Sequence, residues 1–367
     1  RGLCLVATAR ADRDVVVRDL LEPRPLRVRP GGDATGGPGW SVYPRAVVAR
    51  LERAFPAARA GADIAFASDL PPASGLSSSS ALVTALLLAL ATLRGLPREP
   101  AFRERVGSME ALAELAAAVE TGAAFRDLPG DAGVGVRGGS EDHTAILCAR
   151  AGHVSQYAFA PVRREREVAL PAGWSFLVAS SGVTAEKTGA ARDAYNRASD
   201  DARTLLRLWR EAAGADAPHL AAALAADPDA VSRLRALPAA RALLPRLEQF
   251  AEESGTLVPA AADALAAGDM DGVGRLARRS MELAERALGN QVPETLHLTR
   301  SALAAGAAAA SAFGAGFGGS VWALAPERAA GEVLASWRGD YLRHFPERAA
   351  GATFFTTPCA SPATRAR

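Results

Sequence analysis

The fold of this chain is decided at Asp69–Leu90, which reads DLPPASGLSSSSALVTALLLAL. Four consecutive serines, Ser77–Ser80, stand directly before a long apolar run that predicts a buried helix. Serine is a weak helix former and a good N-cap, but one serine is enough to cap a helix. Four of them therefore indicate that this helix start binds something.

The first amides of a helix lack partners within the helix and add to the positive end of its dipole. An anion fits there, phosphate above all, and small residues let it approach the backbone. The segment therefore predicts a nucleotide phosphate site; the alternative is a flexible serine-rich loop that only caps a core helix. It matches neither GxxxxGK[ST] nor GxGxxG, so neither a P-loop nor a dinucleotide fold gains support.

The elements around this segment alternate between strands and helices. Residues 2–9, 14–20 and 62–70 read as strands, and residues 41–55 and 108–122 as helices. Residues 144–162 read as a hairpin that turns near Ala151–Gly152. From about Lys187 to Gly289 the chain reads as helix rich in alanine, leucine and arginine, and residues 310–326 as strand, glycine turn and strand. We therefore expect an α+β chain with a mixed N-terminal lobe, residues 1–170, and a helix-rich C-terminal lobe with its own sheet, residues 171–367.

Length and composition indicate an ordinary globular protein of two domains or lobes. The chain has 367 residues, of which 49% are hydrophobic and 22% charged, and its net charge is only +2. No broad basic field is present, which argues against a nucleic-acid partner. Three widely separated cysteines (Cys4, Cys148 and Cys359), no signal-peptide pattern and no membrane-length apolar run favour a cytoplasmic protein without a membrane partner. The five histidines have no metal-like spacing.

Two motifs carry a family resemblance. Asp69–Thr84 resembles the second signature of the GHMP small-molecule kinases, and FGAGFGGSV at Phe313–Val321 resembles their third. Within that family the galactokinases are the most similar branch, because segments 40–51 (WSVYPRAVVARL), 138–147 (GGSEDHTAIL) and 193–202 (DAYNRASDDA) resemble segments of theirs. The resemblance runs from about Trp40 to Leu324 and implies a two-lobed GHMP-kinase-like α+β fold.

The resemblance also implies an activity: an ATP- and Mg²⁺-dependent sugar kinase that phosphorylates the anomeric hydroxyl of galactose. The ATP phosphates would be held by the backbone of Gly75, Leu76, Ser77, Ser78 and Ser79, steadied by a loop of Gly314, Gly316, Gly318 and Gly319. Trp40 and Tyr43 would lie near the adenine, and Ser79 (with Ser78 as its close rival) and Glu120 would hold the magnesium. Asp142 would be the catalytic aspartate beside the sugar hydroxyl, and Tyr195 would contact the sugar.

The chemistry itself asks for these residue types. Phosphoryl transfer is mostly positioning and charge neutralisation, and Mg²⁺ takes oxygen ligands while keeping several waters. A carboxylate near the attacking hydroxyl can orient it or accept its proton. Each residue also has a plainer interpretation: Asp142 as a turn aspartate, Glu120 as a solvated helix carboxylate, Tyr195 as a surface tyrosine, and Trp40 and Tyr43 as core aromatics.

The chain departs from the family at its start, where the first GHMP signature is not found. It begins at Arg1 rather than at methionine. Either a preceding segment supplies that signature, or the chain lacks part of its sugar site. The functional alternatives are a GHMP kinase for arabinose, glucuronic acid or a heptose phosphate, and a sensor that binds ATP and sugar without turnover. The expected partners are ATP and a small sugar, with the chain a monomer or a weak homo-oligomer.

Overall fold

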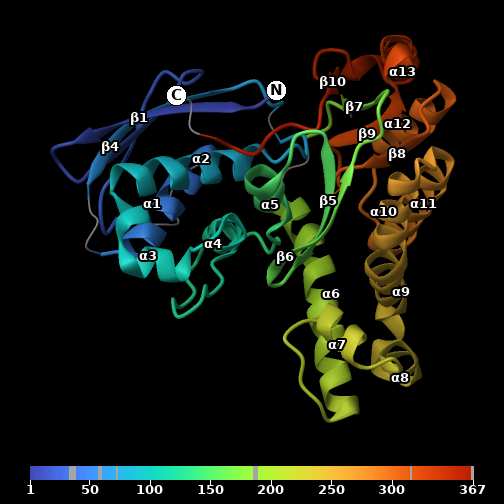
Figure 1. The fold of residues 1–367 in the computed structure, drawn as a ribbon, viewed down its shortest axis with the longest axis horizontal. Coiled ribbons are helices and arrows are strands. Elements are labelled where there is room, and N and C mark those ends of the chain that lie inside the picture. Colours follow the sequence, from blue (N-terminus) through green and yellow to red (C-terminus); the bar gives the residue numbers. More distant parts are fainter. Residues whose placement is uncertain (33–38, 57–59, 72, 185–188, 315, 365–367) are drawn as a thin grey trace.

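The computed structural model of the chain describes residues 1–32, 39–56, 60–71, 73–184, 189–314 and 316–364; of residues 189–195 it describes the backbone. Two lobes, each built on its own four-stranded sheet, stand side by side (Figure 1). The two-lobed α+β fold predicted from the sequence is confirmed. Among the described helices, none combines the length and the apolar run that crossing a bilayer requires.

The first lobe is a sheet covered on one face by helices. Its strands lie in the order β1-β4-β2-β3, with β4 antiparallel to β1 and parallel to β2. Alternate residues face the helices, which fits the period of two in the sequence. The strands are β1 (Leu3–Arg10), β2 (Val15–Asp19), β3 (Leu26–Val28) and β4 (Gly61–Ser68). The helices are η1 (Gly39–Ser41), α1 (Val42–Ala54), α2 (Ser78–Leu93), η2 (Leu96–Arg98), α3 (Pro100–Arg105) and α4 (Met109–Thr121).

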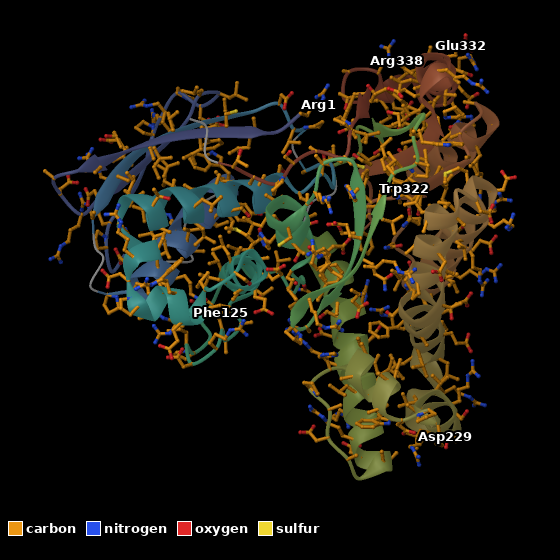
Figure 2. All side chains as sticks on the ribbon, viewed as in Figure 1. Arg1, Phe125, Asp229, Trp322, Glu332 and Arg338 are labelled. Atoms are coloured by element: carbon orange, nitrogen blue, oxygen red, sulfur yellow. The ribbon has the colours of Figure 1, made fainter. Side chains whose placement is uncertain are left out.

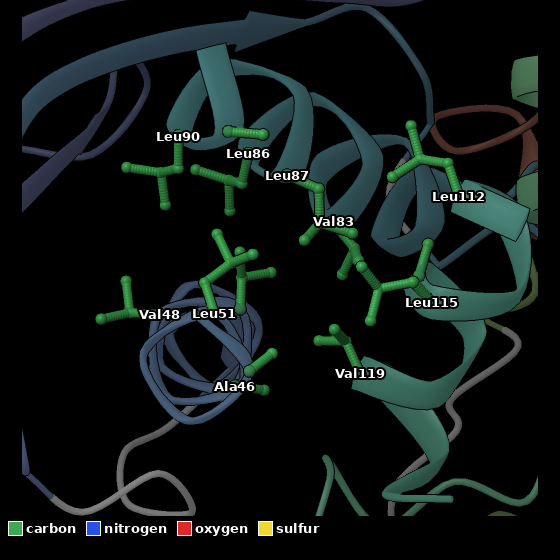
Figure 3. Close-up of a cluster of buried hydrophobic side chains, with 14 of the residues drawn as sticks. Ala46, Val48, Leu51, Val83, Leu86, Leu87, Leu90, Leu112, Leu115 and Val119 are labelled. Atoms are coloured by element: carbon green, nitrogen blue, oxygen red, sulfur yellow. The ribbon is translucent and has the colours of Figure 1, made fainter. Parts of the chain in front are cut away.

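Helix α2 is the centre of this lobe and fixes the position of the serine run. Figure 3 shows its leucines between α1 and α4. Leu86 is fully buried, and Leu87 and Leu90 are nearly so, against Leu51 of α1 and Leu115 of α4. A helix that is apolar on nearly every side is expected in such a position. The body of α2, packed against α1, α4 and strand β1, therefore holds the start of the helix in place.

Truncating α2 in this core is expected to destabilise the chain. Leu86→Ala should lower the free energy of unfolding by about 2–5 kcal/mol, because the removed methyl groups leave a cavity. Urea denaturation measures the change. Leu21→Ala is the matched control, since Leu21 is 81% exposed, and it should shift stability by less than about 0.5 kcal/mol. Equal effects of the two substitutions would contradict the placement of α2.

The predicted hairpin at residues 144–162 is wrong in its first half. The structure shows helix α5 (Glu141–Cys148), and the hairpin follows it as β5 (His153–Phe159) and β6 (Val162–Ala169). Glu141 and Asp142 lie in the first turn of α5, where the helix dipole favours acidic residues. A short apolar run such as TAIL cannot be assigned to helix or strand by periodicity alone.

The second lobe is an antiparallel sheet in the order β10-β7-β9-β8. The strands are β7 (Trp174–Ser180), β8 (Ala309–Ala312), β9 (Ser320–Pro326) and β10 (Thr353–Thr357). Helices α12 (Pro293–Ala304) and α13 (Ala330–His344) pack on it around Trp337 and Tyr341, which are fully buried. The predicted lobe boundary near residue 170 lies in the short link between β6 and β7.

A helical arm extends from this lobe, with Asp229 near its far end (Figure 2). It confirms the helical character predicted up to Gly289, while Lys187 lies outside the described residues. Its helices are α6 (Gly189–Ala213), α7 (Leu220–Ala226), α8 (Ala230–Ala236), η3 (Pro238–Leu243) and α9 (Leu244–Glu252). The chain returns through η4 (Glu253–Leu257), α10 (Val258–Ala267), α11 (Met270–Leu283) and η5 (Ala284–Leu288). Short turns η6 (Glu327–Ala329) and η7 (Pro346–Arg348) flank α13.

Candidate active site

The serine run lies at the start of α2, as the sequence predicts. Three residues that lead into the helix have a left-handed backbone: Ala73 at φ +45°, Gly75 at φ +74° and Ser77 at φ +56°. Ser77 occupies the N-cap position, yet its side chain makes no capping hydrogen bond. The interpretation of the serines as simple helix caps therefore loses its support. The first amides of α2, at Ser78, Ser79 and Ser80, are of the kind that binds an anion.

Two carboxylates from two other helices meet the last serine of the run. The Ser80 hydroxyl donates to Glu120 Oε1 at 3.1 Å and lies 3.5 Å from Asp142 Oδ2. Ser80 is 1% exposed and Glu120 is 8% exposed. The predicted magnesium ligand Glu120 and the predicted catalytic Asp142 therefore come together, 22 positions apart in sequence, under the serine run. Ser80 is not among the site residues predicted from the sequence.

The long loop between these carboxylates folds back on the end of α4. Gly122 ends the helix in a left-handed conformation, and the Glu120 carbonyl accepts a bond from the Val134 amide at 2.8 Å. The buried Arg50 guanidinium of α1 donates to the Ala123 carbonyl and to Asp131 Oδ2. This anchoring closes the loop, so that its length does not separate Glu120 from Asp142.

Tyr43 belongs to the same cluster, on the serine side. Burial raises the pKa of Tyr43, and the Glu120 charge raises it further. The Ser79 side chain acts on the Tyr43 hydroxyl and lowers this pKa, but the net change is upward. The tyrosine therefore stays neutral near pH 7 and can donate or accept a hydrogen bond beside the predicted phosphate site. The structure thus places it against the predicted magnesium ligands, and its adenine contact stays a prediction.

Trp40 is placed by packing rather than by polar contacts. Its ring lies edge-on to Phe66 of β4, with centroids 5.4 Å apart, and it contacts the first-lobe core. This agrees with the plainer interpretation of Trp40 as a core aromatic. A contact with the adenine stays a prediction here also.

His143 also lies in this cluster, although the sequence predicts no role for it. It is 1% exposed, with Nε2 3.7 Å from Glu120 Oε1 and Nδ1 3.4 Å from Thr84 Oγ1. Thr84 lies one turn after Ser80 on the same face of α2. Its position directly after Asp142 is the sequence feature that indicates a place in the site. The spacing of the five histidines does not indicate it, because that spacing only tests for a metal site.

The glycine loop between β8 and β9 packs directly on the serine segment. The Ser320 hydroxyl donates to the Ser74 carbonyl at 2.7 Å across 246 sequence positions. Gly319 has φ +83°, and a Cβ there would lie 2.8 Å from the Ser74 carbonyl oxygen. At Gly316 a Cβ would lie 2.1 Å from the Asn290 carbonyl oxygen. Both positions therefore need glycine, and the loop joins the second lobe to the segment before the serine run, where the phosphates are predicted to bind.

The start of α6 approaches the segment that leads to Asp142. The Asn196 side chain accepts a bond from the Arg137 amide at 3.1 Å, and Arg137 forms an ion pair with Asp200. Tyr195 precedes Asn196 on this helix, and its side chain lies outside the described residues. Its predicted sugar contact stays a prediction.

The donor set at the cluster fits a magnesium ion. Serine hydroxyls and one carboxylate are hard oxygen ligands, and Mg²⁺ completes its shell with water and nucleotide phosphates. Among the described residues, no group of three or more His, Cys, Asp and Glu side chains forms a metal cage. That Ser79, with Ser78 as its rival, and Glu120 would hold the ion stays a prediction.

Comparison with known proteins agrees with this arrangement. The family model for the GHMP kinase N-terminal domain matches residues 42–139, and that for the GHMP kinase C-terminal domain matches residues 261–343. Among curated proteins, none matches the chain in sequence.

Solved structures share the fold at low sequence identity. Lactococcus lactis galactokinase complexed with galactose has a TM-score of 0.79 at 20% identity, over 99% of this chain and 87% of that one. Methanococcus jannaschii mevalonate kinase has a TM-score of 0.56 at 13% identity, covering 96% and 87%. Streptococcus pneumoniae phosphomevalonate kinase, in complex with phosphomevalonate and AMPPNP, has a TM-score of 0.55 at 14% identity, covering 96% and 90%.

The two family models fall on opposite sides of the fold, one in each lobe. The first contains Glu120 and the whole serine run, and the second contains the glycine loop that packs on it. The chain belongs to the GHMP kinase family.

Proposed function

We propose that this chain is an ATP- and Mg²⁺-dependent sugar kinase that transfers a phosphoryl group to the anomeric hydroxyl of galactose. The observation that carries the proposal is the meeting of Ser80, Glu120 and Asp142 beneath the start of α2. The similar fold of a galactokinase bound to galactose supports the choice of sugar. A cytoplasmic location, and a monomer or weak homo-oligomer, belong to the same proposal.

Each group has a separate task in the transfer. The amides at the start of α2 hold the phosphates, and the rigid packing of α2 fixes where they point. Bound Mg²⁺ neutralises charge on the phosphates. Asp142 orients the sugar hydroxyl and accepts its proton as the sugar oxygen forms a bond to the γ-phosphorus. The bond from that phosphorus to the bridging oxygen breaks, and ADP leaves with its electron pair.

The test is ADP release with ATP and Mg²⁺ across a panel of acceptors. We expect release with galactose, and the panel adds arabinose, glucuronic acid, a heptose phosphate and mevalonate. Release with another sugar would keep the mechanism and change the substrate. ATP binding without release for any acceptor would refute the kinase and favour the sensor.

A further inference from the structure

Ser80 differs from the other serines of the run in what it touches. It is almost fully buried, and a buried hydroxyl is expected to be hydrogen-bonded. Its bond goes to Glu120 rather than to a backbone group of α2. The hydroxyl has a single proton and so donates to one acceptor at a time. The distances of 3.1 Å and 3.5 Å assign that proton to Glu120, with Asp142 at the limit of reach.

The surroundings of the two carboxylates differ in how well they stabilise a negative charge. Asp142 lies in the first turn of α5, where the helix dipole stabilises a negative charge. Glu120 is the penultimate residue of α4, where the dipole opposes a negative charge, and it is buried. Ser80 therefore donates its hydrogen bond to Glu120, the carboxylate whose negative charge is less favoured by its surroundings. It also comes from the start of α2, whose positive end favours the same charge.

The orientation of Glu120 is fixed from two sides. Ser80 Oγ and His143 Nε2 both approach the same oxygen, Oε1, at 3.1 Å and 3.7 Å. Two groups on one oxygen restrict the rotation of the carboxylate about its last bond. His143 is held in turn by Thr84, one turn from Ser80 on α2. Helix α2 thus supplies one support directly, through Ser80, and steadies the other, His143 of α5, through Thr84.

We propose that Ser80 is a positioning residue: it sets the orientation of the Glu120 carboxylate and its separation from Asp142, and so prepares the metal site for the ion. The proposal rests on the proposed function, because it assigns Glu120 to the metal. Outer-shell partners of this kind are worth 10- to 100-fold in metal affinity or activity. The competing explanation is that position 80 needs only a small side chain for packing, and that the hydroxyl has no role in the metal site.

The test compares two residues of equal shape at position 80. Ser80→Thr keeps the hydroxyl, whereas Ser80→Val replaces it with a methyl group, so both variants carry the same packing cost. Mn²⁺ binding in the presence of AMPPNP, followed by EPR, gives the metal affinity without turnover. We expect Ser80→Val to bind Mn²⁺ about 10- to 100-fold more weakly than Ser80→Thr, with a matching rise in the Mg²⁺ needed for half-maximal ADP release.

Thr92→Ala is the control for loss of a hydroxyl elsewhere on α2. Thr92 is exposed and bonds only its own helix, through the Leu88 carbonyl, so metal affinity should stay at the parent value. Equal Mn²⁺ affinities of Ser80→Thr and Ser80→Val would overturn the proposal. A parent chain that binds Mn²⁺ with AMPPNP but releases no ADP with any acceptor would instead refute the kinase. The two failures are therefore distinguishable.

Discussion

Replacing Asp142 with asparagine is expected to lower the rate of acceptor-dependent ADP release by roughly 10²- to 10⁴-fold, the usual range for a lost general base. Asparagine keeps the size of the side chain and can still accept the weak contact from Ser80. It cannot take the proton of the sugar hydroxyl, and it removes a charge that orients that hydroxyl. Steady-state kinetics with saturating ATP and Mg²⁺ measure the change.

Glu141→Gln is the matched control for this substitution. Glu141 precedes Asp142 in the same first turn of α5, so its loss removes the same dipole interaction. Glu141→Gln should lose about 0.3–1 kcal/mol of stability and should keep its turnover. Equal turnover in the two variants would show that Asp142 has no part in the chemistry and is only a turn aspartate.

Much of this site could be predicted from the sequence, because a helix start is a local feature. The serine run, Gly75 just before it and the apolar α2 lie within one short segment, and both the helical period and the turn chemistry are visible there. Glu120 and Asp142 were identified only through the family resemblance. Nothing local shows that the loop between them closes on Arg50.

The parts that the sequence did not predict depend on which way a side chain points. Ser78, Ser79 and Ser80 are the same residue type, so the sequence does not distinguish them. Only the register of α2 decides that Ser80 faces the carboxylates while Ser79 acts on Tyr43. The contacts of His143 could not be predicted for the same reason, because its neighbours Thr84 and Glu120 come from other helices. The hairpin error at residues 144–162 arose because a short apolar run has no period of its own.

Glu120→Gln is expected to weaken Mg²⁺ binding by on the order of 100-fold or more, above the 10- to 100-fold range of an outer-shell partner. The substitution keeps the shape of the side chain and an oxygen that can accept from Ser80, but removes the negative charge that holds the ion. The concentration of Mg²⁺ for half-maximal ADP release measures the loss. Glu110→Gln, at the other end of α4, should leave that concentration unchanged.

The same substitution is expected to make the metal-free chain more stable. Glu120 is buried at the negative end of α4 with Asp142 nearby, so its charge is opposed by desolvation, by the helix dipole and by a like charge. A neutral amide of equal size removes all three costs. Thermal unfolding without Mg²⁺ should therefore give a higher midpoint for Glu120→Gln than for the parent chain. A lower midpoint together with unchanged Mg²⁺ dependence would mean that Glu120 serves the fold; weaker metal binding with higher stability is the result expected of a charge kept for function.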